Sequence, residues 1–195
     1  MVDMIRCPSC GELIPCTWVN ELIGFPVRAI GCPYCFEPSK GTIASLLLAI
    51  FYRGKWRTPD YFLRKRNANG LILARSRRDK ITAYLIIREA MLKEDEALIP
   101  GSVFHKITRT KILWVNGEAV GCYTYTIGGG WKIPTMHIIV VRRKFRRKGY
   151  GTMMIKDFLS SFKGKVGIEA PNWIVCRIIE KLGEVDRVVI FSSGL

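Results

Sequence analysis

The sequence predicts an α+β fold: a mixed, mostly antiparallel sheet flanked by helices, with a small four-cysteine module in front of it. Two strand-like segments, 111–115 and 118–126, flank an Asn-Gly pair, which favours a tight hairpin turn. A β-branched apolar run, 136–141, leads through a glycine-containing turn into an amphipathic segment, 152–162, a pattern typical of a buried strand followed by a helix. Two Cys-x-x-Cys pairs near the N-terminus indicate a metal-binding module.

The cysteine pairs are separated by 21 residues. Each pair can direct two thiolates at one ion, and two pairs complete a tetrahedral zinc site. The predicted ligands are Cys7, Cys10, Cys32 and Cys35. A short β-hairpin between Leu13 and Ile30 would make residues 1–40 similar to a zinc ribbon. Two disulfides are the alternative, which an intracellular protein disfavours, and the nearby Cys16 is either a spare ligand or a small buried residue.

The middle of the chain contains several further predicted elements. An apolar run predicts a helix over 41–51, and a further helical turn is expected over 61–67. Residues 71–74 are strand-like. The segment 81–87 is either the partner strand of a hairpin or the start of a helix that reaches Lys93, and its alternation of apolar residues favours the strand.

The C-terminal part continues as strand, helix and strand over 165–170, 174–182 and 187–191, with Gly183 ending the helix. The chain is thereby divided into a zinc ribbon-like module (1–40), a helical connector (41–69) and a main domain (70–195).

The net charge of +15 is unevenly distributed. Residues 1–40 have three basic and four acidic side chains, so the remainder carries about +16. Two clusters dominate: 53–78, with nine basic residues against Asp60, and 142–148, with six and no acid. Such a surplus favours polyanions such as nucleic acid through steering and counter-ion release, or it is a solvated surface that steers an anionic coenzyme.

The sequence shows neither a signal peptide nor a membrane span. The most apolar run, 43–51, is far shorter than the roughly 20 residues that a spanning helix needs. A cytoplasmic protein without a membrane partner is therefore expected.

The turn after the central strand contains the pattern R-x-x-G-x-G, formed by Arg146, Gly149 and Gly151. Glycine has no Cβ, so a ligand can approach the backbone. A helix N-terminus adds unpaired N–H groups and partial positive charge, which together form an anion site. The pattern is neither a Walker loop nor a dinucleotide fingerprint; a basic surface turn is the alternative.

This turn resembles the central motif of the GNAT N-acetyltransferases, Q/R-x-x-G-x-G/A, and the order of elements from 111 to 183 is similar to that family's core. The resemblance implies direct transfer of acetyl from acetyl-CoA to an amine. It also implies that strands 136–141 and 165–170 diverge, with the pantetheine arm between them. The coenzyme contacts that it implies are Ile139, Val141, Arg146, Arg147, Lys148, Gly149, Tyr150, Gly151, Thr152 and Asn172.

The candidate catalytic residues depart from the family pattern. The usual Tyr general acid should fall at Ile179, which cannot donate a proton. Cys176, one helical step away, and Tyr123, on the preceding strand, are candidates, and core packing is the alternative for both. The central strand has no acid but contains His137, whose imidazole exchanges a proton near neutral pH; a core histidine is the alternative. Glu169, at the end of the next strand, is the second candidate base.

A zinc module before such a domain is also similar to the cohesin acetyltransferases, although their finger uses two Cys and two His. This similarity favours a protein lysine, or an N-terminus, as the acceptor amine. A second hypothesis is a zinc-ribbon nucleic-acid-binding or regulatory protein with a catalytically weak GNAT-like domain. Ile179 and the basic clusters favour it, and the intact glycine turn argues against it.

Overall fold

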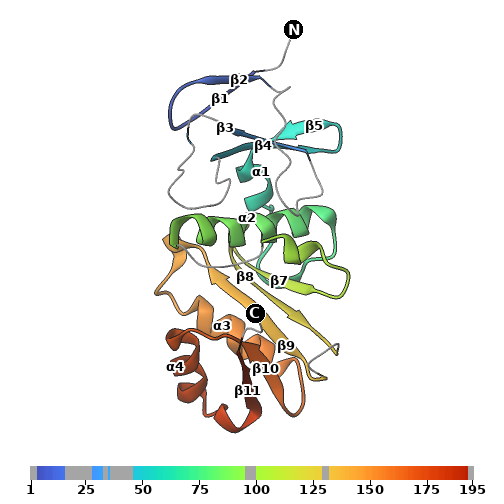
Figure 1. The fold of residues 1–195 in the computed structure, drawn as a ribbon, viewed down its shortest axis with the longest axis vertical. Coiled ribbons are helices and arrows are strands. Elements are labelled where there is room, and N and C mark those ends of the chain that lie inside the picture. The colour runs from blue at the N-terminus through green and yellow to red at the C-terminus, as the bar shows by residue number, and fades with distance from the viewer. Residues whose placement is uncertain are drawn as a thin grey trace.

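The computed structural model describes residues 4–15, 28–32, 35, 46–94, 100–128 and 132–192 (Figure 1). Its N-terminal elements are β1 (Met4–Arg6), β2 (Leu13–Pro15), β3 (Ala29–Cys32), β4 (Leu46–Tyr52), β5 (Lys55–Arg57) and α1 (Pro59–Leu63). The remaining elements are β6 (Gly70–Leu73), α2 (Arg77–Glu94), η2 (Pro100–Phe104), β7 (Arg109–Val115), β8 (Glu118–Thr126), β9 (Thr135–Val141), η3 (Arg143–Phe145), α3 (Tyr150–Ser160), β10 (Val166–Glu169), α4 (Trp173–Leu182), η4 (Val185–Arg187) and β11 (Val188–Phe191).

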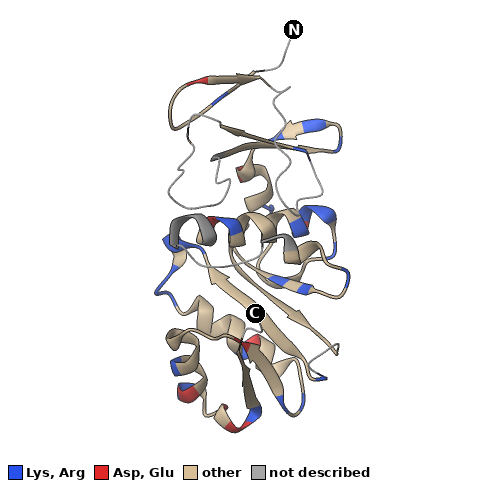
Figure 2. Ribbon diagram, viewed as in Figure 1, with Lys and Arg blue, Asp and Glu red and all other residues tan. Residues whose placement is uncertain are grey.

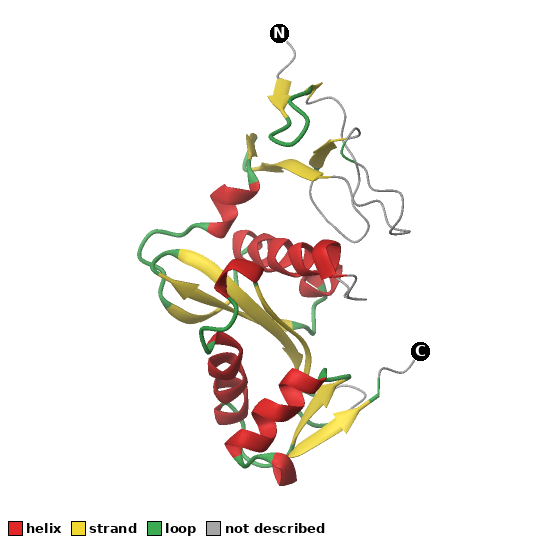
Figure 3. Cartoon of the chain, turned by 90° about the vertical axis from the view of Figure 1, so that its left-hand side faces the viewer, coloured by secondary structure: helices red, strands yellow, loops and turns green. Residues whose placement is uncertain are grey.

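The main sheet has six strands in the order β11-β10-β9-β8-β7-β6. The pairs from β6 to β9 are antiparallel, whereas β10 is parallel to both β9 and β11. Helix α2 covers one face of the sheet, and α3 and α4 cover the other (Figure 3). The predicted α+β fold, with a mixed and mostly antiparallel sheet between helices, is confirmed.

The best-predicted elements are those around the central hairpin. β7 and β8 are joined by Asn116 and Gly117, whose φ angles of 51° and 77° are those of the predicted tight turn. Gly183 ends α4 in the left-handed conformation, φ 69°. The strands predicted over 71–74 and 136–141 are β6 and β9.

The helix predicted over 41–51 is wrong where the structure describes it. Residues 46–52 form β4, which is the central strand of a three-stranded sheet between β3 and β5. Leu48, Ala49 and Ile50 are all buried. A strand covered on both faces lacks the alternation of polar and apolar residues, so its apolar run cannot be told from a buried helix.

The hairpin favoured for 81–87 is also wrong, and the alternative helix is correct. α2 begins with a capping box: the Ser76 hydroxyl accepts from the Asp79 amide at 3.1 Å, and the Asp79 carboxylate accepts from the Ser76 amide at 3.2 Å. Residues 81–88 are buried on all sides. The helix is covered by the sheet and by α1, where the Thr82 hydroxyl donates to the Phe62 carbonyl. Because it has no polar face, its sequence does not show the 3.6-residue period of an amphipathic helix.

The N-terminal module is more extensive than predicted. Most of the segment from Leu13 to Ile30 in which a hairpin was expected, Cys16 included, lies outside the described residues; of its described ends, β2 pairs with β1 and β3 pairs with β4. Because β4 and β5 belong to the sheet of β3, this sheet crosses the boundary at residue 40. The domain division itself stays a prediction.

No helix within the described ranges is both long and apolar enough to cross a membrane.

Candidate active site

The strands β9 and β10 are paired at one end only. Their partner pairs are confined to Thr135–Met136 of β9 and Gly167–Ile168 of β10. β9 then continues to Val141, whereas β10 ends at Glu169. The divergence that the sequence predicted is therefore present, and space opens between the two strands.

β9 carries one extra residue at this point. Tyr125 of β8 is paired with Met136, and the preceding Thr124 is paired with Ile138, so His137 has no partner across the ladder. A bulge bends its strand and re-aims a side chain, and such bulges are common beside active sites. Here it directs His137 toward the divergence.

Beyond the bulge, the peptide groups of β9 have a fixed orientation. The Arg142 amide donates to the Val120 carbonyl of β8 at 2.9 Å. Since peptide groups alternate along a strand, those of Ile139 and Val141 point to the opposite edge, which β10 has left. In agreement, the Val141 carbonyl accepts from Arg146 Nε at 3.0 Å rather than from a strand.

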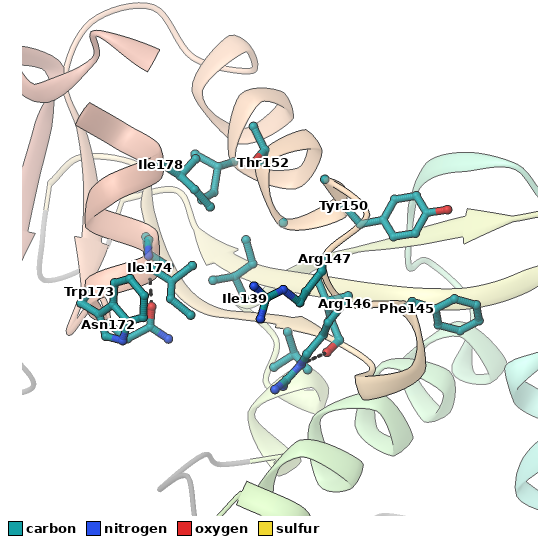
Figure 4. Close-up of a pocket in the computed structure, with 16 residues that line it drawn as sticks. Ile139, Phe145, Arg146, Arg147, Tyr150, Thr152, Asn172, Trp173, Ile174 and Ile178 are labelled. Atoms are coloured by element: carbon teal, nitrogen blue, oxygen red, sulfur yellow. Dashed lines mark hydrogen bonds between the residues drawn. The ribbon is translucent and has the colours of Figure 1, made fainter. Parts of the chain in front are cut away.

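A cavity of about 590 Å³ lies between β9, the turn that follows it, and the starts of α3 and α4 (Figure 4). All predicted coenzyme contacts except one line it: Ile139, Val141, Arg146, Arg147, Gly149, Tyr150, Gly151, Thr152 and Asn172. The exception, Lys148, is exposed and lies outside the lining.

The cavity also has an apolar wall that sequence reasoning missed. Its α4 side is formed by Trp173, Ile174, Val175 and Ile178, and further apolar contacts are Val140, Phe145 and Ile155. In Figure 4 this wall faces Arg146 and Arg147 across the cavity. Ile174, Val175 and Ile178 share one face of α4 and Trp173 lies to the side of it, but this apolar face cannot be told from a core-facing one before the helix is placed. A site that is apolar on one side and cationic on the other suits an extended ligand with an apolar arm and an anionic end.

The glycine turn has the geometry of an anion site. Gly149 is the N-cap of α3 with φ 80° and ψ 0°, which is a left-handed conformation that other residues adopt only under strain. The first intrahelical bond runs from the Met153 amide to the Gly149 carbonyl at 3.0 Å. The N–H groups of the residues before Met153 have no acceptor within the helix. They lie at the positive end of the helix dipole, beside the cavity.

A buried arginine fixes this turn to the rest of the domain. The Arg142 side chain is only 9% exposed; its Nε donates to Glu89 of α2 at 2.9 Å and its Nη1 to the Ala119 carbonyl at 3.0 Å. Glu118 lies 3.5 Å from the same guanidinium and also binds Lys144. The start of the turn is thereby held against α2 and β8.

Two of the four catalytic candidates come together at the apex of the divergence. His137 Nδ1 lies 2.6 Å from Glu169 Oε2, and His137 Nε2 lies 2.9 Å from the Thr126 hydroxyl. Both side chains line a second cavity of about 260 Å³, which also includes Asn172 and Val175 of the larger cavity's lining. Side-chain exposures of 23% and 28% leave this pair reachable from solvent.

The other two candidates are elsewhere. Tyr123 is fully buried under α3, and its hydroxyl donates to Asp157 at 2.5 Å. Burial and the neighbouring Asp157 raise the pKa of Tyr123, so its proton is held. Cys176 is half-buried on α4 and lines neither cavity. Ile179, at the position expected for the general acid, is buried in the core.

The four predicted metal ligands are grouped at the N-terminal module. The sulfurs of Cys7, Cys10, Cys32 and Cys35 all lie within 4.8 Å of one another, with two separations of 3.6 Å. A disulfide would require about 2.05 Å. Tetrahedral zinc with Zn–S bonds of about 2.3 Å places its sulfurs roughly 3.8 Å apart, so the four thiols fit that ion.

The first cysteine pair has a tight local turn. The Cys7 amide donates to the Glu12 carbonyl at 2.8 Å, and the Gly11 amide donates to the Cys7 carbonyl at 3.0 Å. Burial raises the pKa of Cys7, but hydrogen bonds from the Cys10 and Ser9 backbone outweigh it and lower that pKa to about 7. At Cys10, a hydrogen bond from the Glu12 backbone lowers the pKa, but desolvation and the neighbouring thiols outweigh it and raise that pKa to about 12. A thiolate is the form that binds metal.

The class of this domain is defined by parallel strands that diverge, a glycine-capped helix start and a cavity with an apolar wall: it is a mixed α+β domain with a GNAT-like fold. Residues 93–177 match the model of the Acetyltransferase (GNAT) family.

Two curated relatives are similar in sequence. Mouse (Mus musculus) protein FAM169B is 25% identical over 145 residues, which cover 64% of this chain and 42% of the relative. Human (Homo sapiens) protein FAM169BP is 33% identical over 78 residues, covering 35% of this chain and 39% of the relative. The aligned residues thus span about two fifths of the length of these relatives.

Solved structures with a similar fold include two N-acetyltransferases. The ribosomal-protein-S18-alanine N-acetyltransferase of Escherichia coli has a TM-score of 0.46 and 15% identity over 58% of this chain and 76% of its own. The ribosomal-protein-alanine N-acetyltransferase of Brucella melitensis biovar Abortus 2308 has a TM-score of 0.44 and 18% identity over 59% of this chain and 90% of its own.

Proposed function

We propose that this protein transfers the acetyl group of acetyl-CoA to an amine. The observation that carries the proposal is the cavity between the diverging strands β9 and β10, with the glycine-capped start of α3 at its cationic end. In this proposal the amides at the start of α3 bind the pyrophosphate. The pantetheine arm lies along the α4 wall and pairs with the peptide groups of Ile139 and Val141.

The acceptor amine must lose a proton before it can attack, and we propose that His137 is the base that accepts this proton. A neutral imidazole that donates Nδ1–H to Glu169 keeps its lone pair on Nε2; this tautomer is inferred from the carboxylate partner. Nε2 takes the ammonium proton directly or through the Thr126 hydroxyl, its present partner. Glu169 orients the ring and stabilises the imidazolium that forms.

The remaining steps transfer the acyl group. The neutral amine nitrogen bonds to the thioester carbonyl carbon, and the resulting oxyanion accepts from a β9 amide at the open edge. The C–S bond then breaks, an amide is left on the acceptor, and the second proton of the nitrogen passes to the departing CoA thiolate. The usual position of a tyrosine acid is occupied by Ile179, which is buried and has no proton to donate.

The acceptor is proposed to be an amine of a protein, either a lysine or an N-terminus. This choice rests on the sequence resemblance alone. Incubation of the protein with radiolabelled acetyl-CoA and cell-extract proteins tests it: we expect label in stable amide linkage, and its loss in the Gly149→Glu variant. Equal labelling by that variant would contradict the proposal.

We also propose that Cys7, Cys10, Cys32 and Cys35 hold one structural Zn²⁺. Four thiolates leave no open position for catalysis, so the ion serves folding. Among the described residues, the buried cluster of this module contains Ile14, Ile30 and Leu48 beside two of the cysteines. So small a core is a physical reason to need a metal.

A further inference from the structure

The first basic cluster, residues 53–78, takes no part in the coenzyme site. It holds seven Arg and two Lys against one acid, Asp60. The cluster follows the β4–β5 turn, α1 and the start of α2, and Figure 2 shows basic segments at that turn and at the N-terminal end of α2. None of its residues lines either cavity.

Contacts join these elements into one connected surface. The guanidinium groups of Arg57 and Arg78 lie over the ring of Tyr61, at 4.7 Å and 4.4 Å from its centroid. Arg78 also donates to the carbonyl oxygens of Tyr61 at 2.7 Å and of Arg64 at 2.8 Å. β5, α1 and α2 therefore present their cations together.

The acids closest to this surface are already engaged. Asp79 is buried and binds Lys65 at 3.2 Å and the Ser76 hydroxyl at 2.7 Å. Glu118, which bridges to Arg64 in the backbone ladder, is paired with the basic residues of the coenzyme turn. Asp60 is left as the exposed acid of the cluster, so the surface charge is strongly positive.

The same surface lacks the features of a membrane-binding face. All large apolar side chains that are exposed in the described ranges lie outside 53–78. An interfacial membrane contact would need such residues to insert. The aromatic rings are wholly or partly covered: Tyr52 and Phe62 are buried, the half-buried Tyr61 has two guanidinium groups over its ring, and the half-buried Trp56 packs against Phe51. The described part of this surface therefore has no fully exposed aromatic ring on which single-stranded bases could stack.

We propose that residues 53–78 bind the phosphate backbone of a nucleic acid without sequence preference. An Arg-rich surface matches phosphate oxygens through paired N–H donors, and backbone contacts carry no sequence information. This activity lies beyond acetyl transfer and does not depend on it.

The test uses fluorescence anisotropy with the full chain and three labelled probes: a DNA duplex, an RNA duplex and a single-stranded RNA. The variant replaces four exposed arginines, Arg53, Arg64, Arg66 and Arg75, by Gln. The matched control replaces four exposed lysines far along the chain, Lys156, Lys163, Lys165 and Lys181, by Gln, so that both variants lose the same charge.

We expect both duplexes to bind the wild type with an affinity that falls steeply as salt rises. The arginine variant should bind at least about tenfold more weakly. The slope of its log K against log salt should be smaller in magnitude by roughly 0.9 for each lost phosphate contact. The lysine control should retain wild-type affinity and slope. Circular dichroism spectra and thermal unfolding midpoints equal to those of the wild type show that both variants are folded.

Two outcomes would overturn the proposal: no binding to any of the three probes, or equal weakening in both variants. A preference for the single strand over both duplexes would contradict the inference drawn from the covered rings.

Discussion

The cysteine centre is formed by side-chain atoms, whereas the proposed coenzyme cavity is formed largely by backbone groups. At the cysteine centre, four side-chain sulfurs within 4.8 Å of one another make the site. At the cavity, the peptide groups of Ile139 and Val141, the first amides of α3 and an apolar wall make it. A site made of side chains is removed by a single side-chain substitution. A site made of backbone groups tolerates most side-chain changes and fails when the backbone or the free space is altered.

The largest effect is expected at the cysteine centre. Cys32→Ser should abolish stoichiometric zinc binding and unfold the module, because binding free energies of tetrathiolate sites at neutral pH are on the order of 10 kcal/mol. Zinc content by mass spectrometry and thermal unfolding by circular dichroism measure this. Cys176→Ser, at a half-buried cysteine outside the cluster, should retain the ion. Stoichiometric zinc in the Cys32→Ser variant would contradict the assignment of the four cysteines as zinc ligands.

The next effect concerns the backbone of the coenzyme site. Gly149→Glu should raise the Kd of acetyl-CoA by about 100-fold or more, or roughly 2.7 kcal/mol, because it strains the turn and adds negative charge at an anion site. Gly164→Glu is the matched control, since Gly164 also has a positive φ (88°) and open space around it. Calorimetric titration should show normal binding by the control. Equal weakening in both variants would mean that strain alone is responsible.

The catalytic pair should affect turnover more than binding. His137→Gln should lower kcat by about 100-fold with little change in the KM for acetyl-CoA, because the proposed general base is lost while the proposed coenzyme contacts remain. Glu169→Gln should lower kcat by roughly tenfold. Tyr123→Phe should cost about 1 kcal/mol of stability through its lost hydrogen bond and leave kcat unchanged. A large loss of kcat in this variant would contradict the exclusion of Tyr123 from catalysis.

A smaller effect is expected where a side chain supports the backbone site. Arg142→Gln should raise the KM for acetyl-CoA by about tenfold and leave kcat within about twofold, because the turn loses its buried anchor to Glu89 and Ala119. The neighbouring exposed Arg143 supplies the control as Arg143→Gln. Steady-state kinetics that give both variants the same KM would contradict the anchoring role.

The smallest effect lies at the start of α2. Burial raises the pKa of Asp79, but hydrogen bonds from the Ser76 hydroxyl and amide, and then from Lys65, outweigh it and lower that pKa below its usual value near 3.8. The carboxylate therefore adds stability above about pH 4, and this stability is lost as the pH falls through the lowered pKa. Asp79→Asn should cost about 1 kcal/mol at pH 7. In urea unfolding, a variant whose stability still declined with acid as in the wild type would contradict this.

The same contrast explains what could be predicted from the sequence. The four cysteines were identified because their spacing is local. The glycine turn and the Asn116-Gly117 hairpin were identified because special backbone conformations select special residues. The fold of 109–183 followed, since its strands and helices alternate with clear turn signals.

The failures have a physical cause as well. β4 and α2 are each covered on two sides, so neither shows the period of its element. The α4 wall of the cavity consists of ordinary apolar residues, which are indistinguishable from core residues before the helix is placed. The bulge at His137 depends on the register between β8 and β9, which a single sequence does not contain, and so its contact with Glu169 could not be foreseen.

Hydrogen–deuterium exchange with and without acetyl-CoA tests the central claim most directly, because it observes the backbone amides themselves. We predict slowed exchange at Ile139, Val141 and the amides of 149–152, with no change in peptides from 53–78. Unchanged exchange along β9 and the start of α3 at a saturating concentration of acetyl-CoA, or protection confined to another part of the chain, would contradict the account.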